Sequence, residues 1–285
     1  MRRWSAGTDA RPRLFLRAAW CALAVCLAGS LLAPRLAWAH AFWLVPFAPA
    51  VDPGARVALD LRIGPRWPGE STARLPGLVS NFRVTDAMGV RDIAGRTGGA
   101  PVGHFDARVP GAALAAMQTY PSSIVLQGEA FQGYLREEHL EEALRLRAEL
   151  GLAGAAARED FSRCAKTLVV VGGNSRGFDR VLGQALELVP LTDPLAHRPG
   201  RPFGVRLLAA GQPVAGVRVA ALPKFQPEHV VEARTGSDGS VQISLPHGGL
   251  WTFYAVRIEP AARPPADWES TWASLTLALP QEMSP

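Results

Sequence analysis

The chain has 285 residues, of which 48% are hydrophobic and 19% are charged, and its formal net charge is +5. Residues 1–39 hold six of the arginines and one aspartate, so the other 246 residues carry 24 basic and 24 acidic side chains. Because the excess positive charge belongs to this first segment, we exclude nucleic acid as a partner. The remaining length suits one large domain or two small ones.

The first 39 residues have the three parts of a secretory signal. Arginines precede an apolar run over Ala18–Ala33, and Ala37 and Ala39 form a small-residue cleavage site. The apolar run is shorter than the ~20 residues that a membrane span needs. We therefore predict cleavage after Ala39, a periplasmic or secreted protein, and no membrane span after cleavage. The alternative is that residues 1–39 are not cleaved and anchor the protein in the membrane.

Cys164 is the only cysteine of the predicted mature chain, because Cys21 and Cys26 lie in the signal. A single thiol forms no internal disulfide and no cysteine-based zinc site. We predict that Cys164 is a small, buried apolar residue beside a strand.

The residues after the signal show the patterns of β-strands. In Arg56–Ile63 apolar and polar side chains alternate almost perfectly, which indicates a half-buried antiparallel strand. Similar short runs, separated by turns rich in glycine and proline, continue to about residue 125. We expect these strands to form a β-sandwich.

The period changes between residues 130 and 150, where apolar side chains recur at helical spacing. Gly151 and Gly154 end this stretch. A second helical segment is predicted over 155–165, leading directly into an apolar strand at Lys166–Val171. The sequence therefore predicts a helical hairpin over 130–165, inserted between strands as a flap over a sheet edge.

A linker is predicted at 193–200, where two Pro-containing turn sequences occur. Beyond it, short strands alternate with turns about every 8–12 residues, as in a compact sandwich. The predicted fold is mainly β, with two Ig-like or prealbumin-like antiparallel β-sandwiches and a helical insertion. After the signal at 1–39, the predicted domains are 40–192 and 193–285.

Three passages carry a family resemblance: HAFWL at 40–44, YLREEHLEEAL at 134–144 with EDFSRCAKTLV at 159–169, and LWTFYAVRIEPA at 250–261. The chain resembles exported bacterial β-sandwich proteins with a domain of unknown function that is often named for nickel uptake. Its C-terminal half is similar to carboxypeptidase-regulatory-like domains, through GQPVAGVRV at 211–219.

The resemblance implies that the extreme amino terminus, with a nearby histidine, binds the nickel ion, and this role falls on His40 alone. A membrane transporter component is the expected partner. The family pattern commonly has two further histidines. Their positions are held here by Pro65 and Arg257.

His40 becomes the amino-terminal residue if the signal is cut after Ala39. Its α-amine and imidazole are then nitrogen donors suited to Ni²⁺, Cu²⁺ and Zn²⁺. Both groups release protons near neutrality, from unperturbed pKa values of ~6.5 and ~7.7–8.0, so metal binding depends on pH. The alternative is a histidine that only packs or is solvated at the domain edge.

His104 is the second candidate ligand, because it follows a glycine-rich loop in a strand that can lie near the first strand. The remaining histidines form no H-x-H or H-x₃-H pair. We expect His139, His197 and His229 to be solvent-exposed and His247 to lie in a turn.

The sequence contains no P-loop, dinucleotide-binding, nucleophile-elbow or HExxH motif. We predict a periplasmic, non-enzymatic protein that binds or hands over a divalent transition metal. Nickel is the first choice of ion, with copper and cobalt as alternatives. Two other hypotheses stay open: a copper site in which His104 faces the N-terminal histidine, and a scaffold module that binds an envelope partner without metal.

Overall fold

The computed structural model describes residues 41–281, except 75–76 and 96, so the predicted signal lies outside the described residues. The strands are β1 (Ala41–Pro46), β2 (Ala50–Val51), β3 (Arg56–Gly64), β4 (Glu70–Ser71), β5 (Val79–Asp86), β6 (Gly89–Asp92), β7 (Gly103–Asp106), β8 (Gly111–Thr119), β9 (Ser122–Leu126), β10 (Ala157–Val171), β11 (Leu186–Pro190), β12 (Pro202–Ala209), β13 (Gln212–Pro213), β14 (Arg218–Pro223), β15 (Val231–Arg234), β16 (Ser240–Ser244), β17 (Gly249–Pro260) and β18 (Trp268–Leu279). The described helices are α2 (Gly128–Glu137) and α3 (Glu141–Glu149). Neither has the length and apolar character needed to cross a bilayer.

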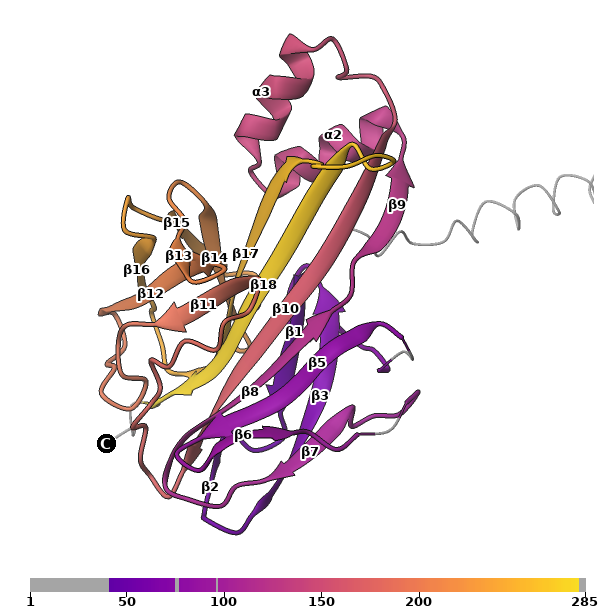
Figure 1. Ribbon diagram of the computed structural model, residues 1–285. Coiled ribbons are helices and arrows are strands. Elements are labelled where there is room, and N and C mark those ends of the chain that lie inside the picture. Colours follow the sequence, from indigo (N-terminus) through magenta and orange to yellow (C-terminus); the bar gives the residue numbers. More distant parts are fainter. Residues whose placement is uncertain (1–40, 75–76, 96, 282–285) are drawn as a thin grey trace, which may run out of the picture. The chain divides into compact units, whose positions relative to one another are not determined.

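A ten-stranded sheet takes strands from both predicted domains (Figure 1). Its order is β15-β14-β17-β18-β10-β8-β5-β6, and β2 and β9 also pair with β10. At its centre β10 runs parallel to β18, from Glu159 opposite Trp268 to Thr167 opposite Thr276. The predicted linker forms turns between β11 and β12, which pair with each other. The two halves of the chain therefore share one sheet.

Two smaller sheets complete two sandwiches. One contains β1, β3, β4 and β7, and the other contains β11, β12, β13 and β16. Alternate side chains of β10 enter different cores: Leu168 and Val170 pack with the C-terminal sheet, whereas Val169 and Val171 pack with the N-terminal sheet. A strand that is buried on both faces needs a continuous apolar run, and this explains the sequence of β10. The prediction of a mainly β protein with two sandwiches and a helical insertion is confirmed, and the parallel β10–β18 pair is an addition to it.

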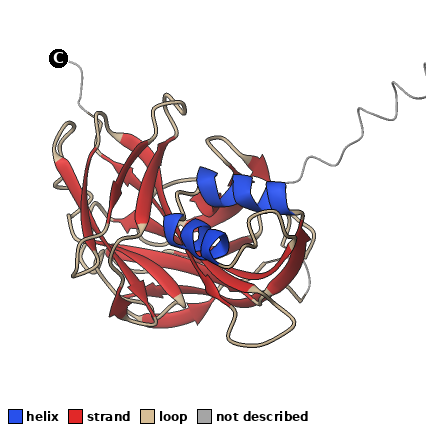
Figure 2. Cartoon of the chain, turned by 90° about the horizontal axis from the view of Figure 1, so that it is seen from above, coloured by secondary structure: helices blue, strands red, loops and turns tan. Residues whose placement is uncertain are grey.

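The helical hairpin consists of α2 and α3 and lies at one end of the long strands β10, β17 and β18 (Figures 1 and 2). Phe131 and Leu135 of α2 are fully buried. They belong to a third core, together with aromatic residues of β1 and β18. The hairpin therefore covers apolar side chains at the strand ends, because its own apolar face would otherwise meet water.

The prediction of a second helix over 155–165 is wrong. These residues lie almost entirely in β10, where Ala157–Phe161 pairs with β9 and Glu159–Thr167 pairs with β18. Strands on both sides take up the backbone hydrogen bonds, so tertiary pairing overrides the local helical pattern. Cys164 in this strand is 1% exposed, which confirms its predicted burial.

A buried ion pair ties β10 to β11. Lys166 Nζ lies 2.7 Å from Glu187 Oε1, and both side chains are at most 1% exposed. The carboxylate also accepts hydrogen bonds from the backbone N–H groups of Leu182 (2.8 Å) and Gly183 (2.9 Å). Burial lowers the pKa of Lys166. The buried carboxylate therefore has both a counter-ion and backbone donors, as such a group requires.

We expect Lys166→Met to lower the free energy of unfolding by about 3–5 kcal/mol, because it leaves the buried Glu187 carboxylate without its cation. Adding Glu187→Gln removes that charge and keeps an oxygen that accepts from the loop N–H groups. The double variant should recover most of the loss. Urea denaturation measures both, and a single variant within about 1 kcal/mol of the wild type would contradict this assignment.

Candidate functional site

His40, the leading metal ligand of the sequence prediction, lies outside the described residues. The residue after it, Ala41, already belongs to β1, pairs with Gly64 of β3 and is 2% exposed. Pro65 follows Gly64 directly, at one position where the family pattern commonly has a histidine. The strand is therefore fixed in the sheet from its first described residue.

Aromatic side chains surround the start of β1. Trp43 is fully buried, and its ring centroid lies 5.6 Å from that of Trp67, whose Nε1 donates to the Leu222 carbonyl at 3.1 Å. Gly69 has a φ of +63°, and a Cβ atom there would lie 2.7 Å from the Trp43 ring. Only glycine fits at this position without a shift. The Trp43 Nε1 atom is buried and has no hydrogen-bond partner among the described residues.

An ionisable network lies next to this aromatic cluster on β10. Glu159 is 4% exposed and accepts hydrogen bonds from Tyr134 Oη (3.2 Å) and from Ser270 Oγ. Burial raises the pKa of Glu159 and, more strongly, that of Tyr134. The Arg163 guanidinium lies 5.6 Å from the Phe42 ring centroid, and burial lowers its pKa to about 10. The network contacts the first strand through this cation–π pair.

A cleft of about 350 Å³ lies between the helical hairpin and strands β14, β15 and β17. His139 stands at its rim in the left-handed region, with a φ of +55°. This conformation is costly for a residue other than glycine, so surrounding contacts must hold it. Arg257, which occupies the second position where the family pattern commonly has a histidine, also lines this cleft.

Ion pairs join the hairpin to the C-terminal strands beside the cleft. Arg218 lies 2.5 Å from Glu232 and 3.4 Å from Glu138, and it donates to Tyr254 Oη at 3.0 Å. Arg234 pairs with Glu141 of α3. Burial raises the pKa of Glu138 to about 7. The effect of burial outweighs the attraction of Arg218, because Arg218 also pairs with Glu232. Glu138 therefore titrates near neutral pH.

The structure does not bring His104 to the start of β1. His104 lies opposite Ala58 on β3, whereas Ala41 lies opposite Gly64. Six residues of an extended strand separate these positions, a distance of about 20 Å. The backbone N–H of His104 donates to the Ala94 carbonyl at 2.8 Å. Within the described ranges, no group of three His, Cys, Asp or Glu side chains is arranged to hold a metal ion.

The other histidines have different surroundings. His139 and His229 are exposed, as expected, with 47% and 60% of their side chains accessible. The prediction for His197 is wrong, because it is 5% exposed and its ring packs edge-on against Phe203 at 5.4 Å. His247 lies in a turn and packs against Trp251 at 4.8 Å.

Fold and site define a mainly β, two-sandwich protein with a helical flap. The chain belongs to the family described as domain of unknown function DUF4198, whose profile matches residues 37–259. No curated protein matches the sequence.

Three solved structures match the chain at low sequence identity and low TM-score. The D0–D1 domain of intimin is 9% identical and covers 82% of this chain and 96% of its own, with a TM-score of 0.21. A bacterial ice-binding adhesin is 9% identical, with coverages of 86% and 66% and a TM-score of 0.23. The BSP domain of a biofilm-associated protein is 12% identical, with coverages of 84% and 30% and a TM-score of 0.20.

We expect the stability of the protein to depend on Glu138 between about pH 4.5 and pH 8. The folded state holds this proton more tightly than the unfolded state, because its pKa of about 7 exceeds the ordinary value of 4.5. The free energy of unfolding therefore falls as pH rises through this range, by about 3 kcal/mol from this group.

Glu138→Gln should remove this contribution, so the variant gains stability relative to the wild type as pH rises. Denaturation curves at pH 5 and pH 8 measure the difference. Glu129→Gln changes an exposed carboxylate in the first turn of α2 and serves as the control. Parallel pH profiles for the wild type and Glu138→Gln would show that Glu138 does not titrate in this range.

Proposed function

We propose that the mature chain is a periplasmic, non-enzymatic protein that binds a divalent transition metal, nickel first, through the amine and imidazole of His40. In this proposal it passes the ion to a membrane transporter. The observation that carries the proposal is that β1 begins directly after His40. A chain end created by cleavage after Ala39 has only one residue before the rigid sheet, so little freedom is lost when it binds.

The family assignment supports a mature chain that begins at His40. The family profile begins at residue 37, three residues before His40, so the domain and the proposed mature chain start almost together. The resemblance to proteins named for nickel uptake suggests the ion. The similarity of the C-terminal half to carboxypeptidase-regulatory-like domains suggests a supporting sandwich.

Two donors from one residue suit a carrier better than a structural site. A structural zinc site closes its coordination sphere with four protein ligands, whereas an amine and an imidazole leave positions open for water or for a receiving ligand. Nitrogen donors of this type favour Ni²⁺ and Cu²⁺ over Mg²⁺ and Ca²⁺. An ion held in this way can be passed on by ligand exchange.

The surroundings of Cys164 argue against a catalytic role for this thiol. Burial raises the pKa of this thiol to about 11, so it is protonated and enclosed at neutral pH. A nucleophilic cysteine needs the opposite environment, with a lowered pKa and access to solvent.

A second candidate function is a binding module that uses no metal. It is favoured by the cleft beside the helical hairpin, where His139 has a strained backbone and three arginines line the walls. In that case His40→Ala leaves the function intact.

Isothermal titration with Ni²⁺, Cu²⁺, Zn²⁺ and Co²⁺ tests the metal proposal on protein prepared to begin at His40. We expect one ion per chain, with affinity that increases from pH 6 to pH 8 as the donors lose their protons. His40→Ala should weaken binding at least tenfold. His104→Ala should leave it unchanged.

The sharpest comparison keeps Ala37-Trp38-Ala39 in front of His40. This extension places the histidine fourth, so its imidazole and the free amine no longer belong to one residue. Equal affinity of the extended and the processed protein would refute the proposal. Binding that disappears with His104→Ala would contradict the proposal, because the structure places His104 far from the start of β1.

A further inference from the structure

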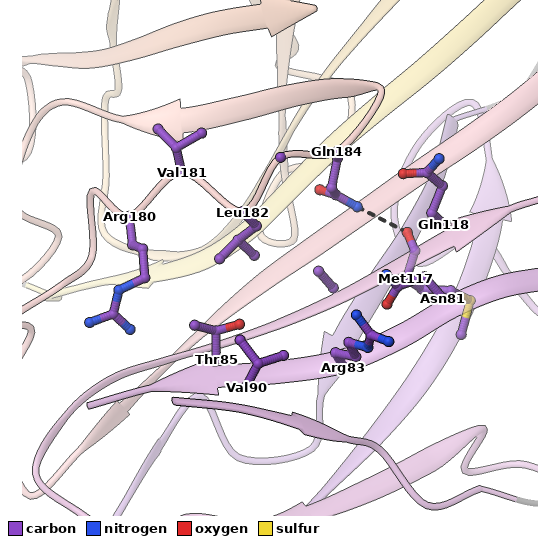
Figure 3. Close-up of a pocket in the computed structure, with 12 residues that line it drawn as sticks. Asn81, Arg83, Thr85, Val90, Met117, Gln118, Arg180, Val181, Leu182 and Gln184 are labelled. Atoms are coloured by element: carbon purple, nitrogen blue, oxygen red, sulfur yellow. Dashed lines mark hydrogen bonds between the residues drawn. The ribbon is translucent and has the colours of Figure 1, made fainter. Parts of the chain in front are cut away.

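A cavity of about 290 Å³ lies between strands β5 and β8 and the loop formed by residues 180–184 (Figure 3). It lies on the N-terminal half of the central sheet, and His104 does not line it. Its volume is at the lower end of the range for pockets that hold small molecules. The proposed function makes no use of this cavity.

The charged side chains that line the cavity are positive. Among the described residues, its lining includes Arg83 and Arg180 and no aspartate or glutamate. Arg180 donates through Nη1 to the Asp86 carbonyl at 2.9 Å and forms no ion pair with a carboxylate in the described part of the chain. Arg83 pairs with Asp92 at 3.1 Å, but 53% and 86% of these side chains are exposed, so water screens the pair. The cavity therefore favours an anion.

The same cavity has an apolar part. Val90 and Val181 are 60% and 51% exposed and line the cavity, and Leu182 and Met117 also contribute to its walls. Large apolar side chains that are exposed beside a cavity are a common feature of ligand sites. An apolar portion of a ligand would cover this surface.

The cavity wall is held in place by contacts described above. Glu187, neutralised by Lys166, accepts the N–H groups of Leu182 and Gly183. Gln184 is 7% exposed, and its side-chain amide donates to the Met117 carbonyl at 3.1 Å, which joins the loop to β8 (Figure 3). A wall that is fixed before binding lowers the entropic cost of taking up a ligand.

We propose that this cavity binds a small organic anion, a carboxylate with a short aliphatic chain. The carboxylate pairs with Arg180, and with Arg83 when that side chain leaves Asp92. The aliphatic chain lies against Val90, Val181 and Leu182. This combination of two arginines and an apolar wall suits such a molecule better than an inorganic anion or a cation.

The test uses the metal-free protein and hexanoate as the probe, with binding followed by the NMR methyl signals of Val181 and Leu182 and by titration calorimetry. We expect shifts at these methyl groups and an affinity that falls as salt is raised. Hexylamine has the same chain with the opposite charge and should not bind. Inorganic phosphate should bind at least tenfold more weakly than hexanoate.

Arg180→Gln should weaken hexanoate binding at least tenfold, which corresponds to about 1.4 kcal/mol. Arg176→Gln changes an exposed arginine of the same β10–β11 connection that does not line the cavity, and this variant should bind hexanoate as the wild type does. If Arg180→Gln is unstable, Arg83→Gln replaces it, with an expected loss of several-fold. The proposal is overturned if hexanoate leaves the methyl signals unshifted or if phosphate binds as tightly as hexanoate. It is also overturned if Arg83→Gln and Arg180→Gln both bind hexanoate with the affinity of Arg176→Gln.

Discussion

The parallel pairing of β10 with β18 is the constraint on which the rest of the fold depends. It joins a strand of the N-terminal half to the last strand of the chain, so that both sandwiches use the same sheet. It also places β10 between two cores, which explains why Leu168–Val171 is entirely apolar and why Lys166 is buried. Because the pairing is between segments far apart in sequence, its formation has a high loop-closure cost that only extensive core packing offsets.

The start of β1 depends on this shared sheet. Ser274 of β18 donates to the Phe42 carbonyl at 2.6 Å, and Arg163 of β10 lies over the Phe42 ring. Trp43 packs with Trp67 on the other face of the strand. Phe42, two residues after the proposed metal ligand, is therefore held by both central strands, and Ala41 is already paired with β3.

Local patterns in the sequence were sufficient to predict most of the strands and the helical stretch at 130–150, but not the break at 138–140 that divides this stretch into α2 and α3. The alternation in Arg56–Ile63 and the apolar stripe around Phe131 each reflect one local period. The strand at 157–165 was missed, because its identity depends on pairing with residues about a hundred positions later. The Glu159–Tyr134–Ser270 network and the cleft beside Glu138 were missed for the same reason: each combines residues from separate elements. The one sequence feature that could have pointed to the cleft is the charged YLREEHL stretch, since Glu138 and His139 lie within it.

The metal proposal rests on a chain end that only processing can create. Mass spectrometry of the intact protein recovered from the periplasm or the medium tests this most directly, because the mass defines the first residue. The account predicts a chain that begins at His40, with residues 1–39 removed. A mature protein that begins at any other residue, or that keeps its signal, would contradict it.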